Sequence, residues 1–400
     1  METVEKEDEV DKMKKDPICG MDVSETQSLK LTKNHQTYYF CSEHCLKSFA
    51  KQNNISAAEA TACLIKPKTK LYKNKTVIVA SVLILVSILS YIAPMLEPFR
   101  KSLFMYFHRI WWAILLGLFL GGVIDHFIPR EYVSHILAKP EKKTIFYSVI
   151  LGFFMSACSH GILALSIELH KKGASNPAVI AFLLASPWAN FPLTILLIGF
   201  FGLKALYIIA CAVIVAIITG LIYQFLESRH LIESNKNMKE PKKGFSMLKD
   251  LKERFRSYRV TTNQISQDIK GILSGSISLA NMVLWWMLIG IGLASLAAAY
   301  IPPTIFQNYM GPTLLGLLVT LIIATILEVC SEGTAPLAFE IYRQTAALGN
   351  VFVFLMAGVV TDYTEIGLLW VNVGRRVAIW LPIITVPQVV ALGILANIIL

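Results

Sequence analysis

The chain has 400 residues, of which 55% are hydrophobic and only 16% are charged. This composition excludes an ordinary soluble domain, and the apolar residues come in runs of about 20, the length that crosses membrane hydrocarbon. The net charge of +10 is concentrated in loops, where it indicates topology and attraction to anionic lipid rather than nucleic-acid binding. We expect an all-α polytopic protein of the cell (cytoplasmic) membrane.

Residues 1–15 are charged with little to bury, and we predict that they are disordered. Residues 16–50 form a small cysteine-bearing α+β module in which Cys19, Cys41 and Cys45 have C-x21-C-x3-C spacing. In a cytoplasmic setting this spacing favours metal over disulfides. The fourth ligand is His44, His35 or none, and the metal is Zn or Cu. About 35 residues cannot build an adequate core, so metal would supply folding energy.

The basic linker at 51–75 ends in five lysines and precedes a first membrane helix at 76–96. By the positive-inside rule these lysines place the N-terminus in the cytoplasm. No secretory signal opens the chain, because the first apolar run starts only at Thr76. A second basic segment, 226–270, is also expected in the cytoplasm, and its apolar spacing at 245–256 predicts an interfacial helix. The candidate spans are 76–96, 110–128, 144–169, 174–202, 203–225, 271–300, 311–341, 350–371 and 376–400.

A duplication relates 105–225 to 271–400. Cys158-Ser159-His160-Gly161 recurs 172 residues later as Cys330-Ser331-Glu332-Gly333. Further matches in the same register include Glu168 with Glu340, and the polar positions Asn190 and Asp362 correspond. We interpret the two segments as internal repeats, with one site at their interface.

Parity of the spans suggests that the repeats are inverted. Five full spans before the basic 226–270 segment would place it outside, so one segment must enter and leave on the same side. We predict a re-entrant hairpin at 144–172 and its counterpart at 311–342, each broken at the Cys-Ser motif. The alternative is nine plain spans with an external basic loop. A second break lies at 186–192. If that segment were also a re-entrant hairpin, the 226–270 segment would again fall on the opposite side of the membrane.

The two hairpin tips carry the chemistry of a soft-cation site. Thiolates at Cys158 and Cys330 favour Cu(I), Zn(II) and trivalent arsenic. His160 adds a borderline ligand, while the carboxylates of Glu332 and Glu328 add charge and proton exchange. Protonation of these groups would drive release and couple export to proton entry. The remaining candidates for the pathway are Ser159, Ser331, Asn190 and Asp362.

Other polar and thiol groups have simpler interpretations. Glu168 and Glu340 either pair with Lys171 and Arg343 at the interface or take part in transport. Cys63 and Cys211 stand alone and are expected to be inert.

Two resemblances follow from these motifs. Residues 16–49 resemble a YHS domain, a metal-associated module similar to TRASH metal-binding domains. Residues 105–400 resemble the predicted permease family that includes organoarsenical and heavy-metal efflux permeases, through both Cys-Ser motifs and the stretches 173–175, 181–187 and 354–358. The resemblance implies export of soft metal ions or trivalent metalloids, with Cys158 and Cys330 as substrate contacts.

The chain departs from the family pattern at three positions. His160 stands where a second cysteine is common, and Ala164 and Val359 stand where proline is usual. Imidazole is a harder ligand than thiolate, which favours Zn(II) or copper over arsenic.

The sequence therefore predicts a secondary transporter, not an enzyme, that exports a soft metal or metalloid. The N-terminal module would accept or sense metal, with a cytoplasmic metal donor as a further partner. The alternative is a permease for a small organic or anionic solute, with a regulatory YHS module. A membrane metalloenzyme is a third class, which no nucleotide-binding motif, acid/base dyad or C-x-x-C supports. No Walker-type loop is present, so energy should come from a gradient. The oligomeric state stays open.

Overall fold

A computed structural model shows how the chain folds, and its contacts divide it into two compact units, Met1–Asn74 and Lys75–Leu400. The residues described are 13–15, 17, 22–24, 29–33, 36–40, 46, 49, 53, 75–127, 142–155, 159–171, 173–236, 262–327 and 331–399.

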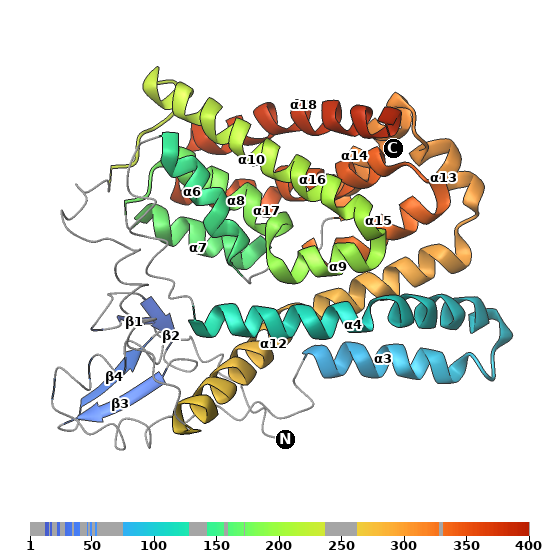
Figure 1. Cartoon of the computed structure of the whole chain (residues 1–400), viewed down its shortest axis with the longest axis horizontal. Coiled ribbons are helices and arrows are strands. Elements are labelled where there is room, and N and C mark those ends of the chain that lie inside the picture. Colours follow the sequence, from blue (N-terminus) through green and yellow to red (C-terminus); the bar gives the residue numbers. More distant parts are fainter. Residues whose placement is uncertain are drawn as a thin grey trace, which may run out of the picture. The chain divides into compact units, whose positions relative to one another are not determined.

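The N-terminal unit contains two antiparallel strand pairs (Figure 1). Strands β1 (Met13–Lys15) and β2 (Asp22–Ser24) pair with Lys14 opposite Val23, and β3 (Leu29–Lys33) pairs with β4 (Gln36–Phe40). Alternation along β3 and β4 sends Leu31 and Phe40 inward, where they are 2% and 0% exposed. The ring of Phe49 packs 5.3 Å from that of Phe40 and completes this small core.

All regular secondary structure among the described residues of the membrane unit is helical (Figure 1). Its helices are α3 (Lys75–Leu89), α4 (Glu97–Phe127), α6 (Lys142–Phe153), α7 (Ser159–Lys171), α8 (Asn176–Ala189), α9 (Phe191–Phe201), α10 (Ala205–Ser228), α12 (Thr262–Tyr300), α13 (Pro303–Met310), α14 (Leu314–Leu327), α15 (Ser331–Thr345), α16 (Leu348–Thr361), α17 (Tyr363–Asn372) and α18 (Arg375–Ile399), with 3-10 turns at Pro94–Leu96 and Gly202–Lys204.

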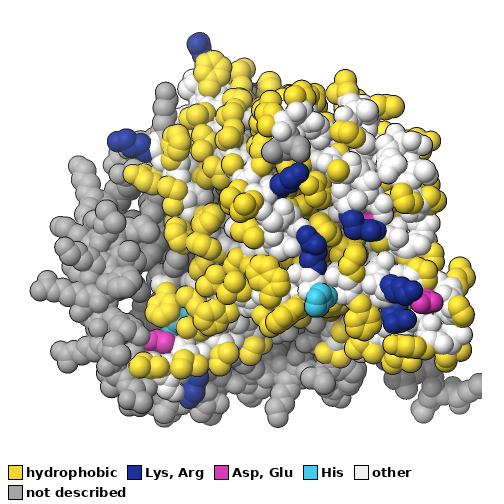
Figure 2. All heavy atoms as spheres, turned by 45° about the vertical axis from the view of Figure 1, so that its right-hand side comes forward, with side chains coloured by type: hydrophobic (Ala, Val, Ile, Leu, Met, Phe, Trp, Pro, Cys, Tyr) yellow, Lys and Arg dark blue, Asp and Glu magenta, His cyan; other side chains and the backbone are white. Residues whose placement is uncertain are grey.

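Long apolar helices confirm the multi-pass membrane protein expected from composition. Five helical segments among the described residues are long and apolar enough to cross a membrane, or six if α13 and α14, which bend by 106° at their junction, form one span. Figure 2 shows hydrophobic side chains over most of one face of the molecule, with Lys and Arg side chains gathered in part of it. Such a surface suits lipid rather than water.

The first membrane segment differs from the continuous helix expected over 76–96. Helix α3 ends at Leu89, a 3-10 turn follows at Pro94–Leu96, and α4 begins at Glu97. Proline causes the break, because Ala93 before Pro94 is held in an extended conformation, with φ −109° and ψ 99°. As a result α4 has 31 residues and begins well before the predicted span at 110–128.

Each predicted hairpin segment contains two described helices, one on either side of its Cys-Ser motif. Helices α6, α7, α14 and α15 have 12 to 15 described residues each, or roughly 18–22 Å of length. Residues 156–158 and 328–330 lie outside the described residues. The breaks at the motifs, the re-entry and the inverted orientation therefore stay predictions.

Helix starts recur at the spacing of the sequence repeat. Helices α6, α7, α8 and α9 begin at 142, 159, 176 and 191, and α14, α15, α16 and α17 each begin 172 residues later. The packing recurs as well, since α8 contacts α6, α7 and α10, and α16 contacts α14, α15 and α18. The halves meet through matching cross-contacts of α9 with α15 and of α7 with α17. The duplication itself stays a prediction from the sequence.

The core of the unit is formed by α8 and α16. Every residue of α8 is buried, as is every residue of α16 except Thr361. A helix that is apolar all round has no face for solvent or lipid, so it occupies the centre of a bundle. The segment predicted at 174–202 breaks at Asn190, between α8 and α9, as the Pro187 and Pro192 pattern indicated.

Candidate functional site

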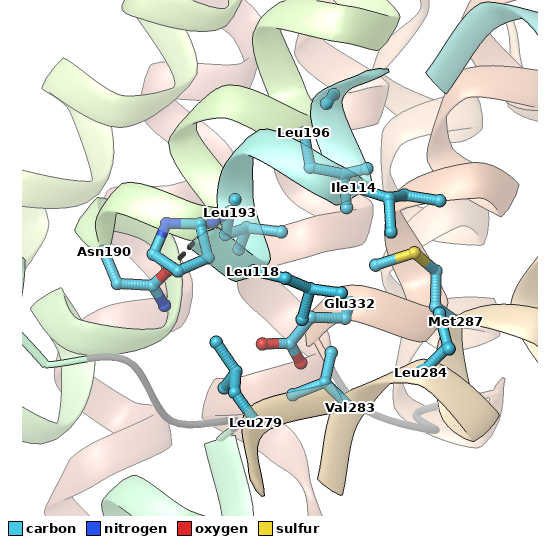
Figure 3. Close-up of a pocket in the computed structure, with 13 residues that line it drawn as sticks. Ile114, Leu118, Asn190, Leu193, Leu196, Leu279, Val283, Leu284, Met287 and Glu332 are labelled. Carbon is cyan, nitrogen blue, oxygen red and sulfur yellow. Dashed lines mark hydrogen bonds between the residues drawn. The ribbon is translucent and has the colours of Figure 1, made fainter. Parts of the chain in front are cut away.

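A small cavity lies among α4, α9, α12 and α15 (Figure 3). It has about 30 Å³ of room for water, enough for about one or two molecules. Its polar lining side chains are Asn190 and Glu332. The other lining residues are Ala113, Ile114, Gly117, Leu118, Pro192, Leu193, Leu196, Leu279, Val283, Leu284 and Met287. The cavity is therefore small and apolar, with two polar side chains in its wall.

Glu332 is the acidic residue of this cavity. It lies in the first turn of α15 and is only 6% exposed. The hydroxyl of Ser331 donates a hydrogen bond of 3.0 Å to its Oε2 atom. The positive end of the helix dipole favours a carboxylate at that place, which lowers the cost of burying it. An ionisable side chain inside a membrane bundle is costly and therefore a functional-site candidate.

Asn190 is the N-cap of α9 and is 1% exposed. Its side-chain oxygen accepts a hydrogen bond of 2.8 Å from the Leu193 amide, and its Nδ2 donates to the Ser186 carbonyl at 2.9 Å. Asp362 caps α17 in the same way, accepting from the Thr364 amide at 2.7 Å. The two corresponding polar positions are thus both helix caps at breaks. Of the two, Asn190 lines the cavity described above.

The remaining predicted site residues divide into two groups. Ser159 and Ser331 are buried at the first described positions of α7 and α15. For His160 only the backbone, within α7, is described. Outside the described residues lie Cys158, Glu328, Cys330 and the N-terminal candidates Cys19, Cys41, His44 and Cys45. Within the described residues, which include Cys211 but no other cysteine, no group of three metal-ligating side chains occurs.

In the sequence we missed that Met287 lines the cavity, and we missed Tyr106 as a partner of Glu340. Met287 lines the cavity from α12, and its only signal was a thioether among bulky apolar residues. Glu340 is 0% exposed and bonded to Tyr106 of α4, a partner 234 residues away. The pairing of Glu340 with Arg343, one of the two interpretations of this residue, is present, with N–O distances of 2.8 and 2.6 Å.

Comparison with known proteins identifies the membrane unit. Residues 101–398 match the model of a family described as predicted permeases. The chain belongs to this family. Residues 14–54 of the permease match the YHS domain, which agrees with the strand-containing N-terminal unit. The chain is therefore a membrane permease with a metal-associated module at its N-terminus.

Relatives of the permease are distant. The UPF0718 protein YcgR of Bacillus subtilis (strain 168) is 26% identical over 259 residues, which cover 62% of this chain and 80% of YcgR. The UPF0718 protein YraQ of Escherichia coli (strain K12) is 24% identical over 136 residues, covering 32% and 39%. A Streptococcus mutans protein, provisionally named a subunit of a two-component membrane permease complex, is 24% identical over 257 residues, covering 62% and 78%. No solved structure matches the permease significantly.

Proposed function

We propose that the permease exports a soft metal cation or a trivalent metalloid, with Cu, Zn and arsenical species as the candidates. One observation carries the proposal: the buried carboxylate of Glu332, two residues after Cys330, faces an apolar cavity of about 30 Å³. Thiolates bind thiophilic ions, and a carboxylate neutralises their charge inside a bundle. The substrate contacts would be Cys158 and Cys330, with His160, Ser159, Ser331, Glu328 and Glu332 around them.

Proton coupling belongs to the same proposal. A buried carboxylate that takes up a proton loses its charge and with it most of its attraction for a cation. Proton entry through Glu332 would therefore release the ion, and the permease would act as a secondary transporter. With the N-terminus in the cytoplasm, the YHS module would hold Zn or Cu there through Cys19, Cys41 and Cys45 and receive metal from a cytoplasmic donor.

Metal tolerance tests the cysteines. Cells that lack their own exporter should gain tolerance to at least one of Cu, Zn, Cd or arsenite when they express the full chain. Cys158→Ser and Cys330→Ser should abolish that gain, whereas Cys211→Ser, buried in α10, should keep it. Unchanged tolerance in Cys158→Ser would sink the metal-export proposal and favour the organic-solute alternative.

Coupling needs a separate assay. In vesicles with an imposed pH gradient, Glu332→Gln should lose gradient-driven metal movement. Glu97→Gln is the matched control, because Glu97 is a carboxylate in a helix first turn that pairs at 2.8 Å with Lys101 on an exposed surface. If the unmodified chain transports metal at the same rate with and without the pH gradient, proton coupling is wrong, whereas metal export is not contradicted.

A further inference from the structure

Met287 and Glu332 line the same candidate cavity. In Figure 3 Met287 comes from α12 and Glu332 from α15, and the carboxyl group of Glu332 is turned toward Leu279 and Val283. Met287 is 6% exposed, as buried as Glu332. The cavity thus brings a soft, neutral sulfur and a hard, anionic oxygen together.

A close contact between the two helices holds these side chains in place. A Cβ atom at Gly290 would lie 2.0 Å from the carbonyl oxygen of Gly333, so α12 and α15 touch through their backbones there. Gly290 is one helical turn after Met287, and Gly333 directly follows Glu332. Met287 and Gly290 are three residues apart and therefore share one face of α12, so the contact at Gly290 orients Met287 toward α15. The packing of α12 on α15 therefore places both side chains on the wall of one cavity.

The chemistry of this pair selects among the proposed substrates. Thioether sulfur is a ligand of Cu(I), whereas protein sites for Zn(II) use thiolate, imidazole and carboxylate.

We infer that Met287 is a direct substrate contact and that the permease is selective for a soft monovalent cation, Cu(I) or its analogue Ag(I), over Zn(II). This inference rests on the proposed metal export and adds the class of ion to it. Met287 and Glu332 form one intermediate binding site on the proposed pathway. A weak neutral ligand there allows fast release, which transport requires.

Substitution by leucine tests the sulfur without opening a hole, since Leu and Met have similar volumes. Met310→Leu is the matched control, because Met310 is also 6% exposed but lines a different cavity. In membrane vesicles containing the full chain, Met287→Leu should lower the rate of Ag(I) or Cu(I) transport at least five-fold. Met310→Leu should stay within two-fold of the unmodified permease, and Zn(II) should move far more slowly than Ag(I) in all three.

A binding measurement gives a second readout. Cu(I) affinity of the purified full chain, with Cys19 and Cys41 replaced by Ser to silence the YHS module, should fall at least five-fold on Met287→Leu. Equal Cu(I) transport and affinity in Met287→Leu and Met310→Leu would overturn the role of Met287 while metal export stands. Faster movement of Zn(II) than of Ag(I) would overturn the selectivity alone. Absence of transport for every metal tested would overturn the proposed function and this inference with it.

Discussion

Tyr106 of α4 donates its hydroxyl hydrogen bond to Glu340 of α15, and both side chains are 0% exposed. The carboxylate also accepts from Arg343 Nε and Nη2 at 2.8 and 2.6 Å and from Gln344 Nε2 at 2.6 Å. A buried carboxylate is tolerated because each oxygen has donors. The network ties the outer helix α4 to the helix that carries Glu332.

Arg343→Ala should destabilise the permease because it leaves Glu340 buried without its countercharge. Removing one donor of a buried acceptor typically costs about 1–3 kcal/mol. Glu340→Ala should cost less, since the Arg343 side chain is 38% exposed and can reach solvent or lipid headgroups. Thermal unfolding in detergent measures both, with Glu97→Ala as the exposed control. A midpoint for Arg343→Ala equal to that of the control would show that the network adds nothing to stability.

Gly290→Ala should separate α12 from α15. Its added methyl group would meet the Gly333 carbonyl at 2.0 Å, and overpacking of this kind costs about 1–3 kcal/mol. The better helix propensity of alanine offsets at most about 1 kcal/mol of that. Gly367→Ala in α17 is the matched control, because nothing lies within 4 Å of the added atom. We expect transport and thermal stability to fall in Gly290→Ala only; equal behaviour of both variants would refute the close contact.

Asn190→Ala should reduce both stability and transport, whereas Asp362→Ala should reduce stability. Each substitution removes an N-cap, at a cost of about 1 kcal/mol. Only Asn190 adds a polar group to the candidate cavity. Comparing initial transport rates at equal amounts of folded protein separates the two effects. If the rates fall equally, Asn190 acts as a cap alone, and Asn190→Asp should then restore stability without an effect specific to transport.

Metal content should report on the YHS module separately from the pathway. Full-length permease purified with Zn or Cu is expected to lose bound metal when Cys19 or Cys41 is changed to Ser, because a tetrahedral or trigonal site does not tolerate loss of a thiolate. Cys211→Ser should retain the metal, since Cys211 is buried in α10. Elemental analysis measures the moles of Zn or Cu bound per mole of protein. An unchanged value in Cys19→Ser would indicate that the YHS module binds no metal.

Much of the membrane unit was predictable because its signals are local. Proline at 187 and 192 indicated the break near Asn190, because proline disturbs a helix within a few residues of itself, and the length of an apolar run is set by the bilayer. The break at Pro94 was not predicted. The 172-residue repeat stays a prediction from the Cys-Ser motifs. The extended start of α4 was missed because hydropathy weakens through its polar first turns, although they continue the helix.

Sequence alone thus determined the class of protein and the break near Asn190. Tertiary structure decided which residues share a space: Glu332 with Asn190 and Met287, and Glu340 with Tyr106. The physical reason is range. Helix breaks depend on neighbours within one turn, whereas a cavity wall depends on how close two backbones approach, as Gly290 and Gly333 do, and such contacts leave no periodic trace in either segment.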